Sequence, residues 1–387
     1  MRPSRNFDVQ SKDSKMKFTV STNILLKGLN IISGSIGANS VLPILEDFLF
    51  KLRGNALKIF ASDLETSMMA TVAVDGTENG IVAVPARILL DTLKALPDQP
   101  LEFDIDNELF TLSITSETGQ YKLAGENGED FPEIPEKDGL QSIQLSGPIL
   151  SAAIGRTLFA TSSDELRPAM TGIKVEIDET GTRFIATDGH KLVKYENRTA
   201  THQGNVNLVL PKKAGSLLKV ALSDEQGDVT VFWNEKNAFF ETNGTILVCR
   251  LIDSVFPDVT RVIPTNNPNE LTIDRMAFQN ALKRIAIFAS KTTYQVVLDI
   301  TASSVRLQAE DPDFSNHAAE QLPCEYTGED MNIAFNARFL IEVLSVLDSA
   351  QVMLQMSVPS RAGLVVPCEQ GENEDLIMLV MPIMTNR

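Results

Sequence analysis

KFTVSTNILLKGLNIISGSI, at residues 17–36, joins two periodicities. Its first residues alternate like a β-strand, and the later ones follow the 3.6-residue period of an amphipathic helix. The pattern returns as SIQLSGPILSAAIGRTLFAT at 142–161 and as ELTIDRMAFQNALKRIAIFA at 270–289. Ser21, Ser146 and Asp274 stand where a helix N-cap is expected. The chain therefore contains a long-period repeat, which predicts three blocks of about 124 residues.

A second strand–helix unit follows about sixty residues later in each block. It reads GIVAVPARILLDTLKALPD at 80–98, VNLVLPKKAGSLLKVALSD at 206–224 and MNIAFNARFLIEVLSVLDS at 331–349. Pro85 and Pro211 lie at or just before the first helical turn, where proline is tolerated. Alternating segments with Asn, Asp and Gly breaks, such as TRFIATDGHKLVKYEN at 182–197, predict hairpins between the helices.

These six units predict an α+β fold of three repeated antiparallel-sheet and helix domains. Such units place sheets outside and helices on one face, an architecture that can close into a ring. The expected divisions are a disordered leader at 1–15 and domains at 16–138, 139–266 and 267–387. The alternative is chance similarity among common patterns, which six matches in order disfavour.

The composition points away from adhesion to nucleic acid through the whole surface. The formal net charge is −17, so any DNA contact must be local. Cys249, Cys324 and Cys368 lack metal-ligand or redox spacing, which favours a reduced compartment, the cytoplasm. No apolar run reaches the length of a membrane span, and the start shows no signal core.

The predicted helices are net basic within this acidic chain. Leu89 and Leu93 follow helical spacing, whereas Arg87 and Lys94 fall on another face. A basic helix face would hold DNA phosphates without reading the bases. The alternative is that lysine and arginine simply favour exposed helix positions. The predicted DNA-binding residues are Lys27, Arg87, Lys94, Arg156, Lys212, Lys213, Lys219, Lys283 and Arg284.

Four segments resemble one family, in order along the chain: VLPILEDFLF at 41–50, FIATDGHKLV at 184–193, FPDVTRVIP at 256–264 and LVMPIM at 379–384. They are similar to the bacterial DNA polymerase III beta subunit, the beta sliding clamp, and the similarity covers about Met16 to Met384. The resemblance implies a non-enzymatic processivity subunit. Two chains would form a head-to-tail homodimer, a six-domain ring that encircles duplex DNA and tethers the replicative polymerase and repair proteins.

The same resemblance implies a clamp loader that opens the ring and partners that dock through short peptides, in a pocket between the second and third domains. Carried over residue by residue, the pocket comprises Arg167, Met170, Thr187, Gly189, His190, Lys191, Leu192, Pro257, Val262, Val358, Ser360, Leu379, Val380, Met381, Pro382, Ile383 and Met384. The methionines of the apolar run at 376–384 suit a surface that adapts to several peptides. Alternatively, residues 376–379 form the last core strand.

Three features depart from the family. Asn39 stands where an arginine is expected, which weakens one predicted DNA contact. Pro168 and Ala169 replace aromatic residues found in some relatives, at the entrance to the pocket. Thr385–Arg387 extends the usual carboxyl end.

Other functions remain open from the residues alone. A hydrolase could use Asp188 and His190 as an acid–base pair, although His190 is more simply a hairpin-turn residue. The three histidines show no metal or nucleophile spacing, and no phosphate-binding loop is present, so no catalytic residue, metal or cofactor is predicted. The last alternative is a repeat-built interaction scaffold with no DNA in its hole.

Overall fold

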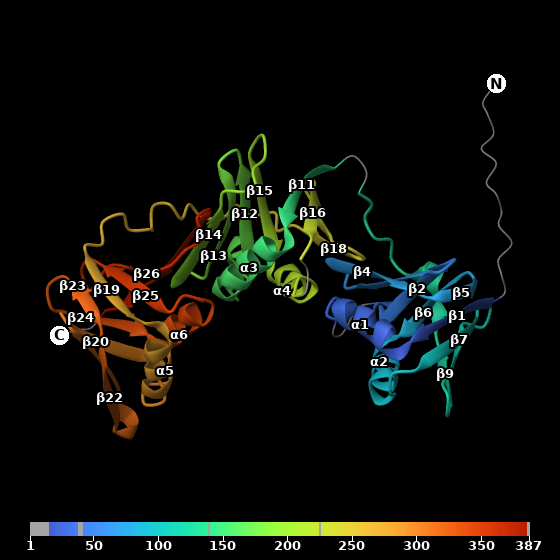
Figure 1. Ribbon diagram of the computed structural model, residues 1–387, viewed down its shortest axis with the longest axis horizontal. Helices are drawn as coiled ribbons and strands as arrows, with labels where there is room; N and C mark the ends of the chain where they lie inside the picture. The colour runs from blue at the N-terminus through green and yellow to red at the C-terminus, as the bar shows by residue number, and fades with distance from the viewer. Residues whose placement is uncertain (1–14, 38–41, 138–139, 224–225, 385–387) are drawn as a thin grey trace. The chain divides into compact units, whose positions relative to one another are not determined.

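The computed structural model describes residues 15–37, 42–137, 140–223 and 226–384 (Figure 1). Asn39, the Thr385–Arg387 extension and all of the predicted leader except Lys15 lie outside these ranges. The chain divides into two compact units. Unit 1 comprises Met1–Gly147 with Leu217–Arg250, and unit 2 comprises Pro148–Ser216 with Leu251–Arg387. The predicted middle domain thus contributes to both units, and the three domain boundaries stay a prediction.

Unit 1 contains two antiparallel sheets. The first has the order β5-β1-β7-β8-β9 and consists of β1 (Lys15–Ser21), β5 (Asp75–Glu78), β7 (Pro100–Asp106), β8 (Thr111–Thr115) and β9 (Gln120–Ala124). The second has the order β10-β6-β2-β3-β4-β18-β17-β16-β11 and consists of β2 (Asp47–Arg53), β3 (Ala56–Ser62), β4 (Thr66–Ala73), β6 (Gly80–Pro85), β10 (Glu126–Asn127), β11 (Gln141–Ser146), β16 (Asp228–Trp233), β17 (Asn237–Glu241) and β18 (Thr245–Arg250).

Helices cover one face of this second sheet. Helix α1 (Thr22–Ser33) packs on β3 and β4, and α2 (Ala86–Ala95) packs on β2 and β6 and beside α1 (Figure 1). Two short 3-10 helices are η1 (Pro43–Glu46), between α1 and β2, and η2 (Gly128–Asp130), between β10 and β11. Two longer helices, α3 (Gly147–Thr157) and α4 (Lys212–Ala221), begin in the residue range of one unit and end in that of the other.

Unit 2 repeats the plan. Its larger sheet has the order β15-β12-β13-β14-β27-β26-β25-β19-β23 and consists of β12 (Gly172–Asp178), β13 (Gly181–Thr187), β14 (Lys191–Asn197), β15 (Val206–Pro211), β19 (Asn269–Asp274), β23 (Glu325–Thr327), β25 (Gln351–Met356), β26 (Gly363–Pro367) and β27 (Glu374–Val380). Its smaller sheet has the order β22-β21-β20-β24-β28 and consists of β20 (Gln295–Thr301), β21 (Ser304–Asp311), β22 (Asn316–Pro323), β24 (Met331–Asn336) and β28 (Pro382–Ile383).

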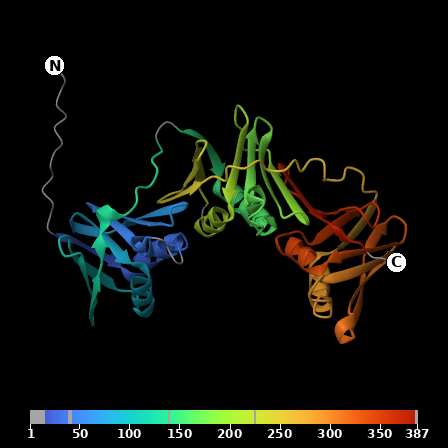
Figure 2. The same ribbon diagram turned by 180° about the vertical axis from the view of Figure 1, so that it is seen from behind.

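The helices of unit 2 are α5 (Arg275–Ile285) and α6 (Ala337–Ser345), with the 3-10 helices η3 (Leu158–Ala160), η4 (Pro168–Thr171) and η5 (Pro312–Phe314). Helices α5 and α6 lie side by side, as the two opposite views show (Figures 1 and 2). None of the helices in the described ranges is both long and apolar enough to cross a membrane.

All six predicted strand–helix units are confirmed, as β1–α1, β6–α2, β11–α3, β15–α4, β19–α5 and β24–α6. The hydrophobic period also predicted the buried faces correctly. Leu89 and Leu93 of α2 and Phe278 and Leu282 of α5 are fully buried, whereas the basic residues of the same helices, Arg87, Lys94, Lys283 and Arg284, are exposed. Burial of each such side chain contributes about 1.5–3 kcal/mol, so packing rather than helix propensity holds these helices in place.

The predicted N-caps differ in outcome. Asp274 caps α5, where its carboxylate accepts the backbone N–H of Ala277 (2.7 Å). Ser21 does stand at the N-cap position of α1, but its hydroxyl donates to Asp98 (2.6 Å) and does not accept a hydrogen bond from the helix. The Asp98 carboxylate accepts the backbone N–H of Asn23 (3.1 Å) in its place. These hydrogen bonds, that from Ser21 first, hold the pKa of Asp98 below its ordinary value. A remote carboxylate therefore caps α1.

Candidate functional site

The turn between β13 and β14 carries the predicted pocket residues at 187–192. The Asp188 carboxylate accepts the backbone N–H groups of His190 (2.8 Å) and Lys191 (2.9 Å), as aspartate commonly does in turns. Gly189 has a φ of +90°, a conformation that favours glycine. His190 is exposed at the tip of the turn, which confirms its interpretation as a hairpin-turn residue.

The Lys191 ammonium is buried and already paired. It lies 2.7 Å from the Asp188 carboxylate, 3.1 Å from that of Glu342, and 4.6 Å from the centre of the Phe339 ring. Although partial burial raises the pKa of Asp188, its hydrogen bonds from Lys191 and the turn backbone outweigh this and leave the pKa below its ordinary value. Asp188 is therefore a charged, structural group, which argues against the hydrolase alternative.

Three segments distant in sequence meet around this turn. A Cβ atom added at Gly189 would lie 3.4 Å from Nη1 of Arg167 and 3.7 Å from Cε of Met170, both next to or within η4. The carbonyl of His190 accepts the backbone N–H of Met381 (2.8 Å), just after β27. The structure therefore brings predicted pocket residues together from η4, from the β13–β14 turn and from the carboxyl-terminal segment.

A hydrophobic cluster, here called the groove floor, extends from this meeting point. Its buried members are Ala169, Ile185, Leu192, Phe256, Val259, Ala362, Leu364 and Leu379. Leu192 and Leu379 are direct neighbours across the β14–β27 pairing. Pro257 lies between two floor residues, and Val262 precedes Ile263, which packs against the floor. Ala169, one of the departures from the family, is thus a small side chain within the floor.

The remaining predicted residues differ in exposure, and most of them are apolar. Val262, Val358 and Met381 are exposed, and Met384 is the most exposed of the four at 69%. Pro257 and Ser360 are also exposed, and Pro382 and Ile383 are half-buried in β28. Val380 is completely buried, so its side chain belongs to the core. An open surface with flexible methionines beside an apolar floor is suited to short peptide ligands.

Sequence reasoning missed several residues that build this site. Phe256 and Val259 are part of the floor and lie within the segment FPDVTRVIP, where their spacing around Pro257 was the available signal. Leu364, Phe339 and Glu342 carried no such signal. They reach the site only through the pairing of distant strands and the packing of α6.

The nine predicted DNA-binding cations do not share one environment. Arg156 and Arg284 are paired within the fold. Arg156 donates to Glu374 (3.0 Å) and lies over the Tyr195 ring, while two nitrogens of Arg284 reach the two carboxylate oxygens of Glu320 (2.8 and 2.6 Å). Lys213 is half-buried. The exposed cations are Lys27, Arg87, Lys94, Lys212, Lys219 and Lys283, and within the described ranges none of these six forms an ion pair.

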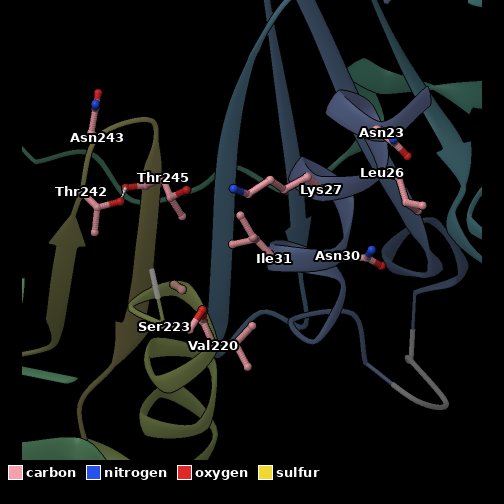
Figure 3. A pocket seen from close by; sticks show the side chains of 11 residues that line it. Asn23, Leu26, Lys27, Asn30, Ile31, Val220, Ser223, Thr242, Asn243 and Thr245 are labelled. Carbon is pink, nitrogen blue, oxygen red and sulfur yellow. Dashed lines mark hydrogen bonds between the residues drawn. The ribbon is translucent and has the colours of Figure 1, made fainter. Parts of the chain in front are cut away.

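Lys27 extends from α1 along a cavity of about 590 Å³ in unit 1 (Figure 3). Asn30 lies on the same helix, and Thr242 and Thr245 lie across from it on β17 and β18 or their turn. Val220, near the end of α4, forms another wall. Amide, hydroxyl and ammonium groups around one cavity can hydrogen-bond phosphate oxygens without base contacts.

Comparison with known proteins covers nearly the whole chain. Residues 16–135, 144–258 and 260–383 match the N-terminal, central and C-terminal domains of the DNA polymerase III beta subunit. The beta sliding clamp of Pseudomonas putida is 29% identical over 370 residues, which are 95% of this chain and 100% of that protein. The beta sliding clamp of Vibrio cholerae is 29% identical over 369 residues, again 95% and 100%.

Solved structures agree with these relatives. A sliding clamp, DNA polymerase III subunit beta, from Pseudomonas aeruginosa bound to griselimycin has a TM-score of 0.89 at 26% identity and covers 96% of this chain and 100% of its own. The corresponding clamp from Bartonella birtlesii has a TM-score of 0.89 at 27% identity, with the same coverage. Three consecutive domain matches and this shared fold establish that the chain belongs to the DNA polymerase III beta subunit family, the non-catalytic sliding clamps of bacterial replication.

Proposed function

We propose that two copies of this sliding clamp subunit close head to tail around duplex DNA, that exposed lysines and arginines on the helices hold the DNA loosely, and that partners dock on the groove floor of unit 2. A clamp loader opens the ring, and the replicative polymerase and repair proteins bind through short peptides. The cytoplasm is the compartment in which such a protein would meet replicating DNA.

The observation that carries this proposal is a repeated joint between sheets. In unit 1, β4 from the first block pairs with β18, the last strand of the second block. In unit 2, β14 of the second block pairs with β27, the last large strand of the third. In each joint, the first strand follows a turn with the same sequence signal, an alanine, a hydroxyl residue and an aspartate. This signal is found at Ala61–Asp63 and at Ala186–Asp188. Each joint connects the strands of two blocks into one nine-stranded sheet.

The same pattern predicts a third pairing of this kind, between two edge strands. Ala309–Asp311 keeps the alanine and the aspartate of that signal and precedes β22, which is an edge strand of its sheet. The last five-residue strand of the first block, β9, is likewise an edge strand. Edge strands present unpaired main-chain groups that favour further pairing. Pairing of β9 in one copy with β22 in a second copy would complete the series and close a two-chain ring.

Exposed apolar groups support this edge as an interface. Ile287 and Phe288 are exposed just after α5, whose Arg284 pairs with Glu320 on β22. Exposed apolar side chains beside an unpaired strand edge are typical of surfaces that become buried on association. The third joint would therefore combine main-chain hydrogen bonds with apolar packing.

A ring explains how an acidic chain can serve DNA. At a net charge of −17 the outer surface repels DNA, whereas the exposed helix cations offer local attraction. Such contacts are non-specific and weaken with salt, so they leave the clamp free to slide. Retention then depends on ring closure, and no tight binding constant is needed.

The edge of β9 permits a precise test of the ring. At the ends of the β8–β9 pairing, the N–H of Gly125 donates to the carbonyl of Phe110, and the N–H of Ser116 donates to the carbonyl of Gly119. Because main-chain groups alternate in direction along a strand, those of Tyr121 and Leu123 bond to β8 and those of Lys122 point outward. Lys122→Pro removes only an outward N–H, which edge strands tolerate. We expect light scattering to give the mass of a monomer for this variant. Its circular dichroism spectrum should be unchanged. Lys122→Ala should remain a dimer, and a dimeric proline variant would contradict the β9–β22 joint.

Substitutions of Arg156 and Lys219 distinguish a structural role from a role in holding DNA. Arg156→Gln breaks a partly buried charged hydrogen bond with Glu374 and should lower the free energy of unfolding by about 2 kcal/mol in urea titrations. Its DNA affinity should keep the parent's salt dependence. Lys219→Gln should leave stability unchanged and reduce the slope of log affinity against log salt by about 0.9 for each phosphate that the side chain no longer neutralises. The reverse pattern would place Arg156 among the residues that touch DNA.

The exposed methionines test the groove. Met381→Ala combined with Met384→Ala removes apolar contact area, and we expect at least tenfold weaker binding of a fluorescent peptide with leucine and phenylalanine anchors, because each buried side chain contributes about 1.5 kcal/mol or more. Fluorescence anisotropy measures the affinity. Met276→Ala, at an exposed methionine on α5, is the matched control and should bind as the parent does. Equal losses in both variants would exclude a specific groove here.

A further inference from the structure

A cavity of about 440 Å³ lies in unit 1 over the β4–β18 joint, in the place that corresponds to the groove floor of unit 2. Its lining residues are Lys58, Phe60, Ser67, Met68, Met69, Ile134, Pro135, Glu136, Lys137, Phe239, Ile246 and Val248. Phe60 and Met69 alternate along their strands with buried Ile59 and Ala70. They therefore point to the sheet face opposite α1.

The strand register aligns this surface of unit 1 with the groove floor of unit 2, residue by residue. In unit 2, one row across the joint runs through Thr187, Leu192, Leu379 and Leu364. In unit 1, the row following the equivalent turn runs through Ser62, Ser67, Val248 and Phe239. The next row runs through Ile185, Lys194 and Ile377 in unit 2, and through Phe60, Met69 and Ile246 in unit 1. Both grooves are thus built on the same positions of the repeat.

The walls correspond as well. Phe256, Pro257, Asp258 and Val259 border the groove of unit 2, and Phe131, Pro132, Glu133 and Ile134 repeat that motif beside the cavity of unit 1. Phe256 is packed into the groove floor, and Phe131 is packed into a cluster that includes Phe60. The chain therefore folds the same connecting segment over both joints.

The chemistry of the two grooves differs. Met69 stands where unit 2 has Lys194, so the second row in unit 1 is wholly apolar. Beside it, Lys51 and Lys58 are exposed and lie directly opposite each other on β2 and β3. Like charges at opposite positions repel, and a ligand carboxylate between them would relieve that repulsion. A basic pair on a chain of net charge −17 favours an acidic ligand.

We propose that this surface of unit 1 is a second docking groove, which takes a short peptide of a partner protein with a leucine or phenylalanine in the cavity and a carboxylate over Lys51 and Lys58. The proposal rests on the proposed peptide-binding function of unit 2. Half-buried Phe60, Met69, Ile246 and Ile134 provide the apolar contacts, and the methionine adapts to more than one anchor.

Methionine methyl NMR on the full-length dimer tests the proposal at both grooves in one titration. The probe is a synthetic hexapeptide with two aspartates followed by leucine and phenylalanine, and its control replaces the aspartates with asparagines. Met69→Leu, Met381→Leu and Met384→Leu assign the signals. We expect the aspartate peptide to shift the Met69 signal in a saturable manner and the asparagine peptide to bind there more weakly.

Lys58→Glu supplies the decisive variant, because it places opposite charges across β2 and β3 and so preserves the sheet. We expect about fivefold weaker binding at the Met69 signal and no change at Met381 and Met384. Lys236→Glu, with the same charge change in the β16–β17 turn, should bind at Met69 as the parent does.

Each other result overturns the proposal in a distinct way. Shifts at Met381 and Met384 alone would exclude the second groove and leave the proposed function of unit 2 intact. No shift at either site would exclude both. A Met69 signal that moves with protein concentration in the absence of peptide would assign the surface to another copy of the chain.

Discussion

Main-chain pairing between strands far apart in sequence is the interaction on which the rest of this structure depends. β4 reaches β18 and β14 reaches β27, and each pairing turns two partial sheets into one continuous nine-stranded sheet. Hydrogen bonds across a sheet are directional and set a fixed register, so the joints position every side chain above them. The surfaces above the two nine-stranded sheets, including both grooves, follow from this pairing.

The joints also explain how a repeat acquires different surfaces. Equivalent positions carry Leu192 and Leu379 in unit 2 but Ser67 and Val248 in unit 1, so the same backbone presents a different apolar pattern. Charges diverge further, since Lys51 and Lys58 face each other in unit 1, whereas Glu176 and Arg183 face each other and form an ion pair at the equivalent positions of unit 2. Backbone symmetry supports the ring, and side-chain differences support the choice of partners.

Much of the fold could be predicted from the sequence, because helical and strand periods are local. The six strand–helix units, the turn at His190 and the burial of Phe278 all follow from spacing within a few residues. Contacts across long separations could not be predicted in this way. Asp98 caps a helix 75 residues earlier, and Arg156 is held by Glu374, 218 residues later. The burial of Val380 depends likewise on its strand neighbours. The resemblance to the family indicated where the pocket lies. The structure was needed to determine which of its side chains are accessible.

Retention on DNA circles tests the central claim, encirclement, most directly. The clamp is loaded onto nicked circular DNA by its clamp loader, freed of unbound protein by gel filtration at a salt concentration that suppresses phosphate contacts, and measured before and after one restriction cut. Closed rings should stay on the circles and leave within minutes once the DNA is linear. Equal retention on circular and linear DNA would show that the chain binds DNA by contact alone, and would contradict the account.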